Sequence, residues 1–441
     1  MSSYTVNIFQ NLRNQHPTWD AMKAFLQSAD GGSLAIKERE DSPYAMVYAK
    51  KGVSDYSRPH VKWFRSVVWR KDTNLPVSIM TQKAELENPL HWEGGMPTDA
   101  KVSTYEDGVT LTAFTEVGAT VAQVATRSQL GAGGKFFKQA TKSFAAMLQD
   151  AVKAEYDPYC GDDVMEYIAK MLEIPTGDGN MVARFSSILL QHPEHRVVKV
   201  NPRPHMIILQ DGFVCADGSV QIFEKVRAVD EYAIKAGETM MGWFERISGG
   251  RDWTWQGVMI HDGAGRRWRI RSAVYQMIRS MRGNTARADE RFFGLRSTGL
   301  VKTYLIYYPE DSTVFWECEQ WLRKATGDLY RYYVDVHKAR TVDAKTVPGE
   351  WHAHVSALHG IFIKTLRPAG QSVSMATVVD YMNGLPVPRL LYLMNLRHRI
   401  AQGKFPRRLV SAATATATTA TATDATDATD ATATAPAIQQ S

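Results

Sequence analysis

Residues 255–284 read WQGVMIHDGAGRRWRIRSAVYQMIRSMRGN, and within this stretch the spacing of apolar residues changes from strand-like to helix-like. RWRIRS shows the apolar–polar alternation of a strand with one solvated face, and WQGVMIH is another short strand-like run. HDGAGR between them predicts a hairpin, in which Asp262 and Gly263 supply the positive φ angles. From Ser272 onward, apolar residues recur three and four apart, which indicates helices. A β-rich region therefore ends here and a helical region begins.

Upstream, from about residue 33 to residue 271, short strand-like runs dominate the sequence. The runs are SLAIKE, YAMVYAKK, VKWFRSVVW, PVSIM, VTLTAFTEV, ATVAQVATR, VARFSSILLQ, RVVKV, HMIILQ, WQGVMIH and RWRIRS. EVGAT predicts a second hairpin, turning at Gly118. Helical stretches at 134–154, 163–172 and 238–247 interrupt the runs without a regular βαβ alternation. The pattern predicts an α+β domain of antiparallel sheets with flanking helices.

The chain divides into three regions. A boundary near Asn284 ends the α+β domain at 1–284, and an all-helical domain with prolines between its helices follows at 285–410. Residues 411–441 alternate Ala and Thr with a repeated DAT triplet. Such a segment has too few large apolar side chains to offset its ordering entropy, so we expect a disordered tail.

Composition narrows the class of protein. The 441 residues are 44% hydrophobic, as in ordinary globular proteins, and no run of 18 apolar residues predicts a membrane-spanning helix. The first residues lack the pattern of a signal peptide. Three scattered cysteines form neither a disulfide framework nor a zinc site. We therefore expect a reducing compartment, cytoplasmic or nuclear, and no membrane partner.

The charge is unevenly distributed along the chain. The net charge is +6, but residues 411–441 carry three aspartates and no Lys or Arg, so residues 1–410 carry +9. A body with this excess attracts polyanions, among which phosphate compounds are the commonest. The alternative is a solvated basic surface with no dedicated partner.

Four segments, in this order, carry a family resemblance: VWRKDTNLPVSIMTQKAE, STYEDGVTL, SSILLQHPEHRVV and WQGVMIHDGAGRRWRIRS. Together they resemble the ATP-dependent RNA ligases of the covalent nucleotidyltransferase superfamily. The nearest likeness is to phage-type single-strand RNA ligases and to RNA-ligase-like proteins of large DNA viruses. The resemblance covers about residues 34–284. It implies an adenylation-domain-like fold, ATP and Mg²⁺ as cofactors, and single-stranded RNA ends or tRNA as partners, in a host cell if the protein is viral.

The resemblance places the catalytic motif at residues 105–108. The family's Lys-x-Asp-Gly lysine takes AMP from ATP, whereas this chain reads Tyr105-Glu106-Asp107-Gly108. Tyr105 stands at the nucleophile's position, and Asp107 and Gly108 are retained. A phenol with the ordinary pKa of about 10 is protonated at pH 7. Lys101 begins about 13 Å upstream along an extended strand, too far to replace the lysine.

Other positions implied by the resemblance are mostly cations that would contact phosphate. Two further positions have lost an acid: Leu189 stands where a glutamate binds ribose, and Gln256 replaces a glutamate that serves the metal. The resemblance leaves the metal ligands undetermined. The candidate nucleotide-binding residues are Arg65, Lys83, Gly108, Arg127, Gln256, Arg269 and Arg271.

Three functions stay open. The first is an active ligase that uses ATP to join or repair RNA ends by adenylyl transfer. The second is a catalytically inactive relative that binds RNA or nucleotide as an interaction module, and the third is a structural protein that kept the fold. Basic residues near the end of the helical domain suggest an RNA-facing surface. They are Arg389, Arg397, Arg399, Lys404, Arg407 and Arg408.

Overall fold

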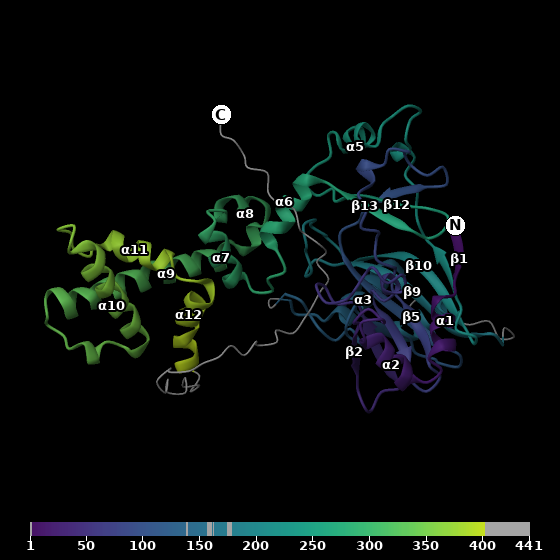
Figure 1. The fold of residues 1–441 in the computed structure, drawn as a ribbon, viewed down its shortest axis with the longest axis horizontal. Coiled ribbons are helices and arrows are strands. Elements are labelled where there is room, and N and C mark those ends of the chain that lie inside the picture. Colours follow the sequence, from purple (N-terminus) through teal and green to yellow (C-terminus); the bar gives the residue numbers. More distant parts are fainter. Residues whose placement is uncertain (1, 138–139, 157–160, 162, 174–178, 402–441) are drawn as a thin grey trace. The chain divides into compact units, whose positions relative to one another are not determined.

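The computed structural model describes residues 2–137, 140–156, 161, 163–173 and 179–401 (Figure 1). They form two compact units, one ending at Ser280 and the other beginning at Met281. This division lies close to the boundary that the sequence predicts near residue 284. The predicted tail at 411–441 lies outside the described residues.

The first unit contains three sheets, and every strand pair in them is antiparallel. The six-stranded sheet has the order β1 (Ser2–Val6), β11 (Val220–Glu224), β10 (His205–Cys215), β9 (Met181–Gln191), β7 (Val109–Glu116), β8 (Gln123–Ala125). The four-stranded sheet has the order β2 (Ala35–Glu38), β3 (Tyr44–Tyr48), β4 (Val67–Arg70), β5 (Leu75–Ile79). The three-stranded sheet has the order β13 (Arg267–Arg271), β12 (Gly257–His261), β6 (Lys101–Thr104). The predicted α+β class with antiparallel sheets is confirmed.

Helices cover the sheets of this unit through three apolar cores. Helices α1 (Ile8–Gln15) and α2 (Trp19–Gln27) pack with the four-stranded sheet. Helices α3 (Phe144–Tyr156) and α4 (Val164–Met171) pack on β7 and β9. Helix α5 (Met240–Ser248) covers one face of the three-stranded sheet, beside β12 and β13 in Figure 1. The opposite face of that sheet is left for other contacts.

Several sequence predictions differ from the structure. The predicted 134–154 helix begins only at Phe144, and Gly131 and Ala132, with positive φ angles of 80° and 47°, form a turn ahead of the predicted start. RVVKV is a loop, and the first part of VKWFRSVVW is a single helical turn at Val61–Trp63. In the β12–β13 hairpin Gly265, not Gly263, has the positive φ.

Strands β1 and β11 and helices α1 and α2 were not predicted. Gly118 does turn the β7–β8 hairpin with a φ of 78°, as EVGAT predicts.

The described residues of the second unit, 281–401, contain only helices as regular structure. They are α7 (Ala288–Ser297), α8 (Val301–Tyr307), α9 (Ser312–Tyr333), α10 (Gly349–Ile361), α11 (Met375–Asn383) and α12 (Val387–Ala401). Helix α6 (Ala273–Arg282) runs across the division between the units. None of the helices in the described part of the chain is long and apolar enough to cross a membrane.

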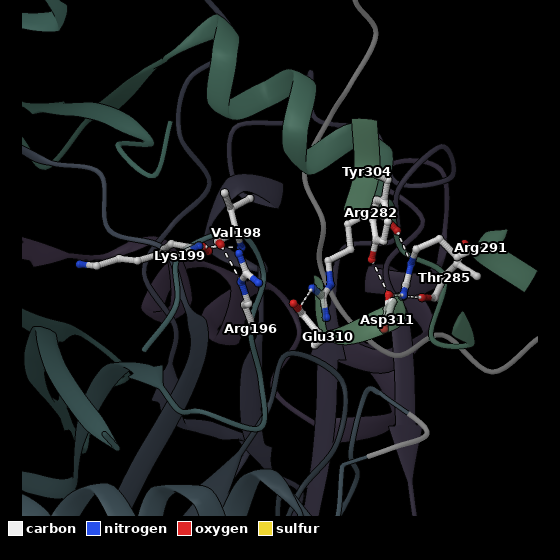
Figure 2. Close-up of polar contacts among 10 residues, drawn as sticks. Arg196, Val198, Lys199, Arg282, Thr285, Arg291, Tyr304, Glu310 and Asp311 are labelled. Atoms are coloured by element: carbon white, nitrogen blue, oxygen red, sulfur yellow. Dashed lines mark hydrogen bonds and ion pairs between the residues drawn. The ribbon is translucent and has the colours of Figure 1, made fainter. Parts of the chain in front are cut away.

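A buried ion pair ties three helical segments of the second unit together (Figure 2). Arg291 on α7 donates to Asp311 at 2.6 Å and to the carbonyl oxygen of Thr285 at 2.5 Å. The Tyr304 hydroxyl donates to the same Asp311 oxygen at 2.5 Å. Because Arg291 is only 4% exposed, its charge depends on these partners for compensation.

We expect Arg291→Gln to destabilise the chain strongly, because it leaves the Asp311 carboxylate buried without its cation. Breaking a buried pair from one side costs about 3–5 kcal/mol. The matched control is Arg323→Gln, which removes an exposed arginine that is 72% accessible and pairs with Glu319 at 3.0 Å. It should cost less than about 0.5 kcal/mol. Urea denaturation of both variants measures the difference, and equal losses would contradict the role of this pair.

Candidate functional site

A cavity of about 680 Å³ lies in the first unit, against the face of the three-stranded sheet opposite α5. Strands β6, β12 and β13 form one wall, and residues of β7, β9 and β10 form another. The segment after β5, including Lys83, also lines it. The cavity is therefore built from elements far apart in the sequence.

The alternation of β13 places arginines in this cavity. Trp268 and Ile270 are buried in the core under α5. Since successive side chains of a strand point to opposite faces, Arg267, Arg269 and Arg271 share the other face. Arg267 and Arg269 line the cavity, and Arg271 reaches Tyr105 at its edge. The same five residues thus anchor the sheet and supply the charge.

Positive charge dominates the cavity. Among the described lining residues, nine are Lys or Arg and three are Asp or Glu. The cations are Lys51, Arg65, Lys83, Arg127, Lys225, Arg227, Arg267, Arg269 and Arg279. Burial lowers the pKa of Arg267 to about 10, and neighbouring Arg65 lowers the pKa in the same direction. A bound anion would raise the pKa of Arg267 again, because it stabilises the charged guanidinium.

The three acids of the cavity wall are turned toward other partners. Asp107 accepts hydrogen bonds from the backbone N–H groups of Val198 and Lys199, at 2.9 and 3.0 Å. Glu106 lies 3.8 Å from the Lys199 ammonium, and Glu224 lies 3.6 Å from the His261 ring. Glu224 still raises the pKa of Arg267, and its Oε2 has no hydrogen-bond partner among the described residues, so the acids compensate only part of the arginine charge that faces the cavity.

Tyr105 lies at the end of β6, at the edge of this cationic wall. Its backbone N–H donates to the Gly257 carbonyl oxygen at 2.9 Å, which ties it to β12. Its hydroxyl accepts a hydrogen bond from Arg271 at 2.9 Å, and the Arg271 guanidinium lies 5.2 Å from the ring centroid. The phenol oxygen is thus held beside a fixed cation.

The electrostatic environment changes the acidity of this phenol. Burial by itself would raise the pKa of Tyr105, but nearby guanidiniums lower the pKa to about 8. The cations responsible, strongest first, are those of Arg271, Arg269, Arg279 and Arg65. A phenol with a pKa of about 8 is roughly one-tenth ionised at pH 7. By contrast, burial raises the pKa of Tyr275 on α6.

Gly108 and Gln256 complete this edge of the cavity. A Cβ on Gly108 would lie 2.7 Å from the Leu190 carbonyl oxygen, so only glycine lets β7 and β9 approach here. Gln256 is 4% exposed, and its Oε1 has no hydrogen-bond partner among the described residues. A buried amide oxygen without a partner is costly unless a ligand or water donates to it.

The structure brings the predicted site residues together. Tyr105, Asp107, Gly108, Arg65, Lys83, Arg127, Gln256 and Arg269 line the cavity, and Arg271 contacts Tyr105. Arg65 lies in the turn before β4 rather than in a strand, and donates to Thr81 at 3.4 Å. Arg127 donates to the Ala49 carbonyl oxygen at 2.7 Å. Leu189, at the position implied for a ribose glutamate, is also in the wall.

Several cavity cations were missed by the sequence analysis. Arg267 has the same strand parity as Arg269 and Arg271, a signal that was present in RRWRIRS. Lys225 and Arg227 also alternate along their segment. Lys51 and Arg279 carried no such pattern, because a loop and a helix bring them to the cavity.

A second cavity, of about 370 Å³, shares the 104–107 segment and Gln256 with the first. Its other lining residues include Lys199, Arg251 and Trp255. The Arg251 guanidinium lies 5.9 Å from the Trp255 ring centroid. Tyr105 therefore borders two open spaces.

The basic end of the helical unit is only partly described. Arg389 donates to His354 at 3.2 Å. The side chains of Arg397 and Arg399, and all of Lys404, Arg407 and Arg408, lie outside the described residues. No group of three His, Cys, Asp or Glu side chains suited to a metal occurs in the part of the chain that the structure describes.

Comparison with protein-family models and with curated protein sequences finds no match for this chain.

Titration of the phenols checks the electrostatics of this site. We expect one tyrosine of the native chain to ionise near pH 8, because guanidiniums lower its pKa, and this transition should be missing in Tyr105→Phe. Tyr275→Phe is the control, since burial raises the pKa of Tyr275 and its loss should leave that transition unchanged. Ultraviolet difference spectra of tyrosinate measure it. A transition near pH 8 that persists in Tyr105→Phe would contradict the site as described.

Proposed function

We propose that this cavity binds the phosphates of a nucleotide and of an RNA end, as part of an RNA-ligase-like protein. The observation that carries the proposal is the convergence of nine described cations, from segments between residues 51 and 279, on one cavity. Guanidiniums stay charged at any physiological pH and bind phosphate oxygens through paired donors. A charge of this density in a concave site is typical of polyanion binding.

The relation of the segments in space supports an adenylation-domain-like arrangement. The 105–108 loop, the Gln256-Gly257 pair and the β13 arginines all lie along one three-stranded sheet. Tyr105 bonds to Gly257, and Met259 is paired with Arg269. They belong to two of the four segments that carry the resemblance to ATP-dependent RNA ligases, and Lys83 and Leu189, from the other two, also line the cavity.

The residues present fit ATP better than they fit a protein-held metal ion. The cavity has the size of an ordinary small-molecule site, about 300–1,000 Å³. Cations on one wall suit a triphosphate, and Leu189, Ile207 and Met259 supply apolar wall for a base. Mg²⁺ prefers carboxylates together with phosphate oxygens. Asp107 is bonded to backbone N–H groups, Glu106 lies near Lys199 and Glu224 lies near His261. The guanidiniums would therefore neutralise the charge of the triphosphate.

The identity of residue 105 bears on whether the protein is an end-joining enzyme or an interaction module. A ligase of the usual kind needs an amine at this position, so the lysyl-AMP step has no residue to carry it here. Binding of ATP or of a 5′-phosphate needs only the cations. A joining assay with pre-adenylylated RNA, which bypasses the first step, distinguishes an end-joining enzyme from an interaction module. Joined product supports the enzyme; binding without product supports the module.

Arg269→Gln should weaken binding of ATP and of a 5′-phosphorylated single-stranded RNA. Loss of a charge-assisted hydrogen bond of about 1.5–3 kcal/mol corresponds to roughly 10- to 100-fold in affinity. The salt dependence of RNA binding should fall by about one unit of slope. Equilibrium binding at several salt concentrations measures both effects.

The matched control is Arg266→Gln, which removes the neighbouring arginine. Its side chain is 56% exposed, pairs with Asp262 at 2.7 Å and does not line the cavity. This variant should bind like the unaltered chain. Equal weakening by both substitutions would show a diffuse charge effect and contradict the cavity as the binding site.

A further inference from the structure

Tyr105 is the nucleophilic side chain that the cavity positions most firmly. Its N–H is bonded to the Gly257 carbonyl oxygen, and two residues later Asp107 is bonded to two backbone N–H groups of the 198–199 loop. Gln191 also donates to the Asp107 carbonyl oxygen at 2.7 Å. These bonds hold both sides of the short segment that carries the phenol. Its oxygen therefore has a defined position beside the cations.

Two of the three described lysines that line the cavity have other contacts. The Lys83 ammonium lies 4.6 Å from the Tyr56 ring centroid, and Lys225 pairs with Asp211 at 2.9 Å. Lys51 lies in an exposed turn. Lys101 is at the far end of β6, opposite His261, and does not line the cavity. An acceptor for a phosphorus atom bound at the arginine wall is better supplied by Tyr105.

We propose that Tyr105 is a covalent nucleotidyl acceptor, forming an O-linked tyrosyl-AMP with ATP bound in this cavity; the inference rests on the proposed function. The Tyr105 Oη attacks the α-phosphorus of ATP. The new bond is Oη–P, the bond between the α-phosphorus and the bridging oxygen breaks, and pyrophosphate leaves. The phenol proton goes to solvent. The arginines both lower the proton affinity of the attacking oxygen and neutralise the charge that develops on the phosphates.

The arrangement of groups around the phenol supports this chemistry. Arg271 donates to the phenol oxygen at 2.9 Å. The pKa of Tyr105, lowered to about 8 despite burial, places more phenolate at neutral pH than an ordinary tyrosine has. Tyr105 also borders the second cavity, so the residue lies where the two cavities adjoin.

The test is incubation of the full chain with ATP labelled at the α-phosphate, with Mg²⁺ as counter-ion of the nucleotide, followed by a denaturing gel. We expect label on the protein that survives mild acid and hydroxylamine, because it is a phosphate ester of a phenol. A lysine phosphoramidate is lost in acid, and an acyl phosphate is lost in hydroxylamine. ATP labelled at the γ-phosphate should leave no label. Peptide mapping should place one adenylyl group on Tyr105.

Tyr105→Phe should reduce the label to background. The control is Tyr48→Phe, which removes the hydroxyl of a buried tyrosine on β3 that does not line the cavity, and should retain full label. Acid-labile label, or undiminished label in Tyr105→Phe, would overturn the proposal.

Equilibrium binding of ATP to the unaltered chain is measured in parallel. This measurement distinguishes failure of the covalent step from failure of the proposed function. Binding without label overturns the covalent step and leaves the proposed function standing. Absence of both binding and label overturns both.

Discussion

The crowding of guanidiniums in one partly buried cavity is the constraint on which the rest of the site depends. Burial lowers the pKa of Arg267 and of Arg271, and neighbouring arginines lower both further. A base whose pKa falls on folding makes the folded state less favourable at every pH where it is charged. This arrangement therefore lowers the free energy of unfolding of the protein without ligand. A ligand with several negative charges that binds the folded state would raise the free energy of unfolding again.

The three-stranded sheet can hold arginines that repel one another, because apolar side chains of the same strands are packed on its opposite face. Trp268 and Ile270 are packed in the core beneath α5, while Arg267 and Arg269, which alternate with them, face the cavity. Strand β12 follows the same rule, with Val258 and Ile260 in that core and Met259 in the cavity wall. The apolar face of the sheet thus fixes the direction of its charged face, and Tyr105 is bonded to the edge of the same structure.

The face of the sheet on which a side chain lies could be predicted where apolar and polar residues alternate regularly along a strand. RWRIRS has a period of two, and with the HDGAGR turn before it this was enough to expect a hairpin and two arginines on one face. RVVKV failed because a short apolar run does not state whether its backbone pairs with a strand; here its amides bind Asp107 instead. Helix α1 begins two residues after strand β1 ends, too close for the coarse pattern to separate them.

The cavity itself could not be predicted from local pattern, because it is formed by tertiary contacts. Arg279 comes from α6 and Lys51 from a loop, and neither position is marked in the sequence. The acidity of Tyr105 likewise depends on four arginines, each of which lies 40 residues or more away in the sequence.

A crystal structure of the protein with a non-hydrolysable ATP analogue tests the central claim most directly. The account predicts the triphosphate in the 680 Å³ cavity, with its oxygens in contact with Arg269 and Arg267 and its α-phosphorus nearest the Tyr105 oxygen. Analogue bound at another surface, with the cavity arginines paired to protein groups alone, would contradict it.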